Sequence, residues 1–166
     1  GLDGMNAMER EGLAGERVAE LTGGLAAVRS RLARAAEAAG RPVESITLLP
    51  ITKFFPATDV AILWRLGCRS FGESREQEAA AKIAEFDRLV ADGDSGQDAV
   101  GARWHMVGRI QRNKAKHIAQ WADTVHSVST GAVVDALEDG CARAQAEGRR
   151  SRRLRVFVQI SLDGDT

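Results

Sequence analysis

The sequence predicts a parallel α/β fold. Apolar segments of strand length alternate with amphipathic segments of helix length along most of the 166 residues, and this alternation implies right-handed crossovers and a parallel sheet. No Gly-x-Gly-x-x-Gly or Gly-x-x-x-x-Gly-Lys segment follows an expected strand, which counts against a dinucleotide or nucleoside-triphosphate site. The favoured fold is therefore part of a (β/α)8 barrel, and a doubly wound open sheet is the alternative.

The composition argues against several classes of protein. Lys and Arg number 23 and Asp and Glu number 23, so the net charge is zero and no overall field attracts nucleic acid or an anionic membrane. Cys68 and Cys141 are too few for a disulfide framework, and no signal segment is recognised, which makes the cytoplasm the expected compartment. No apolar run approaches the roughly 20 residues of a membrane span.

The first fifteen residues carry several glycines and no clear apolar period, so we expect residues 1–15 to form a disordered leader. From Glu16 onward, apolar residues recur every three or four positions, which predicts an amphipathic helix. Gly40 and Pro42 end this helix.

A strand, a helix and a second strand follow. The run from Ile46 to Thr52 is nearly all apolar, which is typical of a strand buried on both faces, and Lys53 ends it. Thr58 or Asp59 is expected to cap the next helix. The second strand is expected over residues 68–71.

A capping-box pattern, Ser74-x-x-Gln77, predicts another helix directly after that strand. A loop rich in Gly and Asp then interrupts the pattern over residues 91–101. The remaining expected elements are a strand over 103–107, a helix over 111–121, a strand over 124–128, a helix over 130–147 and a strand over 154–161.

Polar residues gather where the expected strands end, and in parallel α/β folds that edge carries the functional site. Lys53 is the strongest candidate for a reactive residue. Partial burial at a strand end favours the neutral amine, which forms an imine with an aldehyde. Taken alone, a lysine at a strand end more often reaches solvent. Ser74, His105 and His126 lie at the ends of later strands.

The other reactive side chains favour structural roles. His105, His117 and His126 lack the spacing of a metal site, so we expect no metal. His105 lies in an apolar strand, where a histidine is more often part of the core. The arginine-rich run over 149–155 is interpreted as a solvated loop.

Four segments of the sequence stand out together: Ile46–Lys53, Phe71–Glu78, Trp104–Lys114 and Val125–Val128. The most specific is the segment Trp-His-x-x-Gly-x-x-Gln-x-Asn-Lys, which begins at Trp104. In order and spacing, these segments resemble the pyridoxal-phosphate homeostasis protein family (YggS/PROSC type). The resemblance extends from about Glu16 to the end of the chain.

The resemblance implies a (β/α)8 TIM barrel of the alanine racemase N-terminal type. It also implies pyridoxal 5′-phosphate held as an imine on Lys53, the lysine that follows the first strand. Ser74 stands where the family has an asparagine near the cofactor ring, and His105 and His126 match positions at the barrel mouth. Phe55 replaces a second family lysine, so a cation near the site is lost.

The function implied by the resemblance is a protein that carries pyridoxal 5′-phosphate as a Schiff base and maintains its intracellular level without catalysis. Apo-enzymes that receive the cofactor are the expected partners. One alternative is a pyridoxal-phosphate-dependent amino-acid racemase, although the chain has no tyrosine to act as the second base. Another is a domain that binds a phosphorylated metabolite without an imine.

Members of the family continue past the fifth strand, and their later loops hold the cofactor phosphate. We therefore expect residues 16–166 to form the N-terminal part of the barrel, with about the first five βα units. A truncated product or incomplete record of this kind is expected to hold the cofactor weakly or not at all, and to expose a sheet edge.

Overall fold

The computed structural model describes residues 6–92 and 101–160. Its first element, the helix α1 (Ala7–Ala38), begins well before Glu16. Asn6 caps it through a reciprocal capping box, in which the Glu9 amide donates to Oδ1 of Asn6 at 2.8 Å and the Asn6 amide donates to Oε2 of Glu9 at 3.0 Å. The expected leader over 1–15 is therefore wrong for residues 7–15, where the cap outweighs the low helix propensity of two glycines. Residues 1–5 lie outside the described residues.

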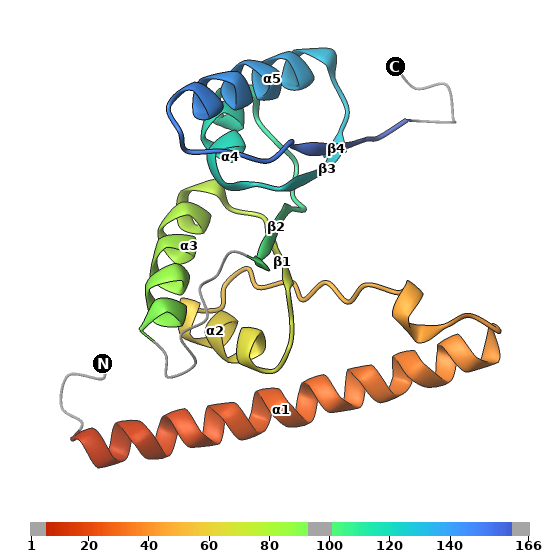
Figure 1. Cartoon of the computed structure of the whole chain (residues 1–166), viewed down its shortest axis with the longest axis vertical. Coiled ribbons are helices and arrows are strands. Elements are labelled where there is room, and N and C mark those ends of the chain that lie inside the picture. Colours follow the sequence, from red (N-terminus) through yellow and green to blue (C-terminus); the bar gives the residue numbers. More distant parts are fainter. Residues whose placement is uncertain (1–5, 93–100, 161–166) are drawn as a thin grey trace.

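The strands form a four-stranded parallel sheet in the order β1-β2-β3-β4, which confirms the parallel α/β class. Figure 1 shows the strands following one another away from α1, with helices between them. The described residues form an open sheet, not a closed barrel. After α1 the elements are η1 (Val43–Ser45), α2 (Ala57–Arg65), β1 (Ser70–Glu73), α3 (Glu76–Ala91), β2 (Arg103–Met106), η3 (Arg112–Lys114), α4 (Ala115–Trp121), β3 (Thr124–Val128), α5 (Gly131–Ala146) and β4 (Arg155–Val158).

The expected strand over 46–52 is reduced to a single parallel bridge between Ile51 and Gly72. The Gly72 amide donates to the Pro50 carbonyl and the Thr52 amide donates to the Gly72 carbonyl, each at 2.8 Å. Ile51 is 43% exposed, so the expectation of burial on both faces is wrong at that position. Among the described residues this segment pairs only with β1, at the sheet edge, and nothing covers its other side.

Two expected helix caps are also absent. Pro56 precedes α2, so Asp59 lies in the first helical turn and accepts from Arg17 of α1 at 2.8 and 3.0 Å. Arg75, not Ser74, is the N-cap residue of α3, and it makes no side-chain capping bond. At α2, the expected cap Asp59 lies inside the helix and pairs with Arg17 instead. At α3, the expected cap Ser74 lies one residue before the N-cap.

The first half of the core lies between β1, β2 and the helices α2 and α3. Four aromatic side chains form its centre: Trp64, Phe71, Phe86 and Trp104. The Phe86 and Trp104 rings meet edge to face with centroids 5.3 Å apart, and the Phe71 and Trp104 rings are also 5.3 Å apart. Such contacts add about 0.5–1.5 kcal/mol each to the burial of the rings.

The second half of the core lies between β2, β3 and the helices α4 and α5. It contains Met106, Val125, Ile118 and Leu137. Gly140 lets α5 approach α4 closely, because a Cβ atom there would lie 2.9 Å from both Cβ of Ala119 and Cα of Lys116. The helix pairs therefore cover one face of the sheet, and its other face stays open.

The helix α1 crosses the end of the molecule beside α2, and most of its length is exposed (Figure 1). Among the α1 residues whose side chains the structure describes, Leu25 and Ala36 are buried, whereas Val28, one of the recurring apolar residues, is 44% exposed. The Arg17 guanidinium pairs with the buried Asp59 carboxylate, and these hydrogen bonds raise the pKa of Arg17. Among the described residues, no helix has the length and apolar character needed to span a membrane.

Candidate functional site

The open face of the sheet carries both candidate histidines. Along β2, Trp104 and Met106 enter the helix-covered core, so His105 lies on the opposite face. Along β3, Val125 enters the core and His126 lies on the open face by the same alternation. Strand alternation thus brings the two side chains to the same face. His105 is half-buried on the face opposite the helix-covered core, so its interpretation as a core histidine is wrong.

The two histidines contact each other across neighbouring strands. Nδ1 of His105 and Nε2 of His126 are 3.0 Å apart, and the rings are stacked with centroids 5.3 Å apart. The ring of Phe157 on β4 stacks on the other side of His126 at 5.2 Å. Burial lowers the pKa of His105, and the charge of His126 lowers it further. The hydrogen bond needs an acceptor nitrogen, so one of the two rings is neutral while it lasts.

A hollow of about 490 Å³ lies over this face of the sheet. Four arginines and one aspartate contribute charge to its lining, which favours an anionic ligand. Arg155 also lowers the pKa of His105. The lining residues are Thr47, Ser70, Arg103, His105, Asp123, Thr124, His126, Arg152, Arg153, Arg155 and Phe157.

Lys53 follows the bridge to β1, as expected, but its side chain is exposed. The expected partial burial of its amine is therefore wrong, because the described residues leave this edge of the sheet uncovered. Nζ of Lys53 lies 6.0 Å from the centroid of the Phe54 ring, and the Arg75 guanidinium lies 4.4 Å from the same centroid. Arg75 thus supplies a cation close to Lys53, which sequence reasoning missed since Arg75 lies beyond a different strand.

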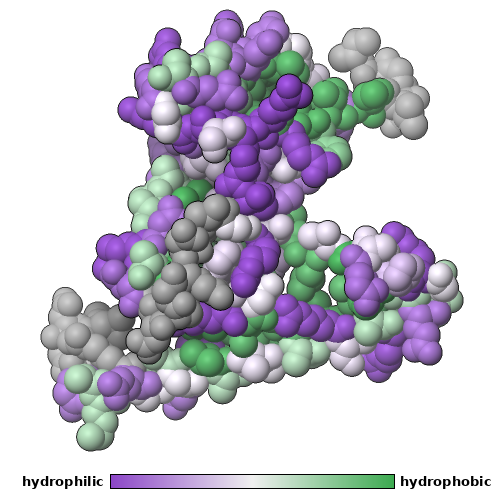
Figure 2. Space-filling model, in the orientation of Figure 1, coloured by the Kyte–Doolittle hydropathy of each residue, from purple (hydrophilic) through white to green (hydrophobic). Residues whose placement is uncertain are grey.

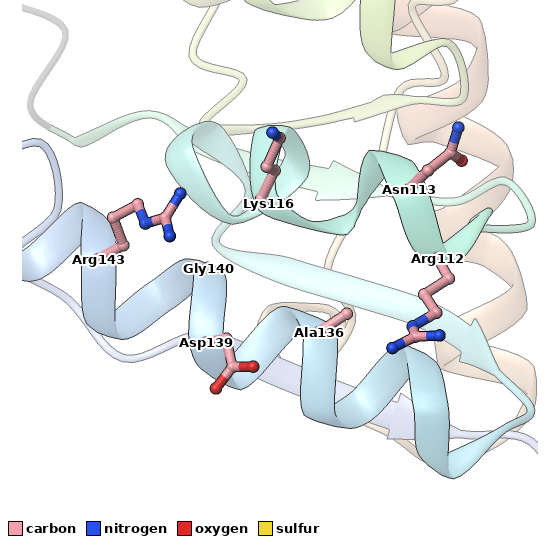
Figure 3. Close-up of a pocket in the computed structure, with 7 residues that line it drawn as sticks. All are labelled: Arg112, Asn113, Lys116, Ala136, Asp139, Gly140 and Arg143. Carbon is pink, nitrogen blue, oxygen red and sulfur yellow. The ribbon is translucent and has the colours of Figure 1, made fainter.

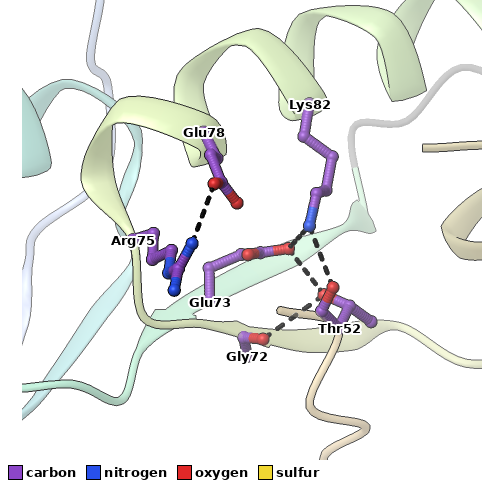
Figure 4. A network of polar contacts seen from close by, with 6 residues as sticks. All are labelled: Thr52, Gly72, Glu73, Arg75, Glu78 and Lys82. Carbon is purple, nitrogen blue, oxygen red and sulfur yellow. Dashed lines mark hydrogen bonds and ion pairs between the residues drawn. The ribbon is translucent and has the colours of Figure 1, made fainter. Parts of the chain in front are cut away.

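A buried polar network holds the residue before Lys53 (Figure 4). Oγ1 of Thr52 donates to Oε1 of Glu73 at 2.8 Å, and Nζ of Lys82 donates to the same oxygen at 2.8 Å. The Lys82 amine also donates to the Thr52 carbonyl at 2.9 Å. Only the tertiary structure shows this network, because no sequence spacing links Lys82 of α3 to Thr52.

Ser74 lies apart from the histidine pair. It is half-buried beyond β1 and lines a pocket of about 410 Å³ with Met106, Arg109 and Lys114, among others. A Cβ atom at Gly108 would lie 3.1 Å from Cβ of Ser74, so this glycine permits the close approach of the two loops. Within the described parts of the chain, no hydrogen bond or ion pair joins Ser74 or Lys53 to the histidines.

A further groove of about 720 Å³ lies between η3, α4 and α5, on the helix side of the sheet (Figure 3). Arg112, Asn113, Lys116 and Arg143 line it together with Asp139, and none of them is a candidate from the sequence. Across residues 6–92 and 101–160, no group of three His, Cys, Asp or Glu residues is arranged to hold a metal ion.

No family model matches the chain. The chain is 65% identical over 150 residues to the pyridoxal phosphate homeostasis protein of Mycobacterium tuberculosis, which covers 90% of this chain and 58% of that protein. The chain is a homologue of the pyridoxal phosphate homeostasis proteins. The protein of that name from Escherichia coli is 33% identical over 141 residues, which cover 85% of this chain and 54% of that protein. These matches confirm the resemblance seen in the sequence.

Solved structures agree with this assignment. PipY of Synechococcus elongatus, solved with PLP bound, matches with a TM-score of 0.56 and 32% identity, over 81% of this chain and 56% of that chain. A protein of unknown function from Bifidobacterium adolescentis matches with a TM-score of 0.66 and 30% identity, over 84% of this chain and 55% of that chain. The chain spans little more than half the length of the curated relatives it matches.

Proposed function

We propose that this chain is the part of a pyridoxal 5′-phosphate carrier that holds the cofactor as a Schiff base on Lys53, without catalysis of its own. Support comes from the names of its homologues and from PLP bound in PipY. The observation that carries the proposal is an exposed amine on a buried, hydrogen-bonded root, at the end of the segment that pairs with β1.

The residues present fit this cofactor. Pyridoxal 5′-phosphate supplies an aldehyde carbon, which a neutral amine joins through a C=N bond while the carbonyl oxygen leaves as water. The exposure of Lys53 lets a small molecule reach its amine and lets water reverse the bond. Arg75 beside Phe54 and the arginines around the open face attract the phosphate dianion.

The candidate residues have different roles in this proposal. Lys53 binds the cofactor covalently, and Ser74, two residues after the bridge partner Gly72, is the proposed second contact to the same ligand. The pair of His105 and His126 offers one neutral ring nitrogen and a polar surface on the open face. Apo-enzymes that accept the cofactor are the proposed partners, because an exposed carrier amine can be approached by a second protein. No observation favours the racemase alternative.

Reduction with borohydride tests the proposal. Adding pyridoxal 5′-phosphate to the full-length protein should give an absorbance band at roughly 410–430 nm, and borohydride should then fix the cofactor on Lys53, as located by mass spectrometry. Lys53→Ala should abolish the band, and Lys116→Ala, which removes another exposed amine, should leave it unchanged. An adduct on a different lysine, or none, would overturn the proposal.

A second measurement separates a carrier from an enzyme. A carrier should not exchange the α-proton of amino acids in deuterated water, because that exchange needs a second base positioned across the cofactor ring. Exchange that depends on Lys53 would show catalysis and would overturn the non-catalytic part of the proposal.

A further inference from the structure

We infer that the network of Thr52, Glu73 and Lys82 is a positioning device for Lys53. The inference rests on the proposed function, because it concerns the residue that would hold the cofactor. Neither Glu73 nor Lys82 lines the hollow over the open face, so they act on Lys53 only through the hydroxyl and the carbonyl of Thr52.

Every polar group of Thr52 is engaged. Its amide donates to the Gly72 carbonyl at 2.8 Å, and its hydroxyl donates to Oε1 of Glu73 at 2.8 Å and lies 3.3 Å from the same Gly72 carbonyl. Its carbonyl accepts from Nζ of Lys82 at 2.9 Å and from the Phe55 amide at 3.0 Å. That carbonyl belongs to the peptide group whose nitrogen is the Lys53 amide. The root of Lys53 is therefore fixed, although its tip is free.

The network has a high free-energy cost, because it buries two charged side chains. The side chains of Glu73 and Lys82 are only 1% and 9% exposed, so both charges have lost most of their water. Oε2 of Glu73 is buried and has no hydrogen-bond partner in the described residues. Because an apolar pair of similar volume often gives equal or greater stability, stability alone does not account for these residues.

Fixing the root of Lys53 serves the proposed reaction directly. Condensation with an aldehyde needs the amine within a narrow range of positions, and a mobile backbone would have to be ordered each time the ligand binds. The network also keeps the Lys82 amine hydrogen-bonded and therefore unavailable to an aldehyde. Lys82 donates two hydrogen bonds and is nine-tenths buried, which leaves Lys53 as the accessible nucleophile of the pair.

Thr52→Val tests the inference with the smallest change in volume. It removes the hydroxyl bridge to Glu73, so the apparent affinity of Lys53 for pyridoxal 5′-phosphate should fall about tenfold, measured from the yield of borohydride-fixed adduct. Thr52→Ser retains the hydroxyl and should bind as the wild type does. Arg88→Ala removes an exposed ion pair on the same helix α3 and should change nothing.

Lys82→Met alone leaves the Glu73 charge buried without its partner, so it is expected to lower the free energy of unfolding. The double variant Glu73→Leu/Lys82→Met removes both charges together and should keep the thermal midpoint near that of the wild type. It should still lose affinity about tenfold, because the Thr52 carbonyl is released. Loss of affinity at unchanged stability is the result that a merely structural role does not give.

Amide hydrogen exchange supplies a readout that needs no cofactor. The Phe55 amide donates to the Thr52 carbonyl, so its exchange should be faster in Thr52→Val and in the double variant. Unchanged exchange and unchanged affinity in both variants, with the wild type reacting at Lys53, would overturn the inference alone. If the wild type forms no adduct, the proposed function has failed, and exchange at Phe55 decides whether the network positions this segment.

Discussion

The two faces of the sheet differ in what covers them. On the helix side, Trp104 of β2 is 4% exposed and packs against Phe71 and Phe86. On the open side, Phe157 of β4 is 49% exposed and contacts only the histidine ring stacked on it and a nearby arginine among the described ring contacts. Side chains of the same chemical class therefore contribute to stability on one face and to an accessible surface on the other.

The surface of the molecule reflects the same difference. Figure 2 shows hydrophobic surface near the end of β4, where Val158 and Ile160 are 59% and 76% exposed. The open face carries histidines and arginines, whereas on the covered face the buried Glu73 carboxylate is paired with Lys82. Burial thus marks the residues that hold the fold, and exposure together with charge marks those available to a ligand.

Truncating one aromatic ring on each face gives the largest expected contrast. Phe86→Ala should lower the free energy of unfolding by about 3–5 kcal/mol, because the ring is fully buried among three other aromatic residues. Phe157→Ala should cost less than about 1.5 kcal/mol, because half of the ring is already in water. Urea denaturation of both variants measures the contrast, and equal losses would show that the two faces are not different in this way.

Adding one methyl group to a glycine tests the packing of the covered face. Gly140→Ala should lower the free energy of unfolding by about 1–3 kcal/mol, because the new Cβ meets Ala119 and the Lys116 backbone at 2.9 Å. Gly23→Ala in α1 meets no atom within 4 Å and should raise it by about 0.5–1 kcal/mol through helix propensity. Thermal unfolding checks the opposite signs. A stable Gly140→Ala variant would mean that α4 and α5 adjust easily.

The pH dependence of the open face is the smallest expected effect. The pKa of His105 is lowered in the folded chain, first by burial and then by the charge of His126, so the unfolded chain binds its proton more readily. This residue therefore contributes stability that is lost as the pH falls below the ordinary histidine pKa of about 6.5.

His126→Asn should raise the pKa of His105, since it removes one of the two main causes of the lowering. The remaining burial should keep the value below that of an exposed histidine. Titration of the His105 ring protons by NMR measures the change, and a pKa that stays the same would show that the two rings do not influence each other.

Several elements follow from local pattern alone. The strand β3 (Thr124–Val128) has the bounds expected from its apolar alternation. Thr130 caps α5, because its hydroxyl oxygen accepts a hydrogen bond from the Val133 amide at 3.3 Å. The start of α1 was missed because glycines obscured a capping box at Asn6. The length of the strand expected over 46–52 was overestimated. An apolar pattern does not show how many neighbouring strands are present to pair with the segment.

For the candidate site, side-chain alternation along β2 and β3 explains why His105 and His126 share one face, although the sequence favoured a core position for His105. The position of Lys53 after the first sheet segment also followed from the sequence. Its exposure, the nearby Arg75 and the buried pair of Glu73 and Lys82 did not.

The sequence by itself thus determined the alternation of strands and helices, the parallel sheet and the family resemblance. Each of these follows from the spacing of residues over short stretches of the chain. The tertiary structure alone decided which face is covered, which lysine is held by buried charges and which is free. These depend on contacts such as that between Thr52 and Lys82, which are distant in sequence and meet only when α3 packs on the sheet.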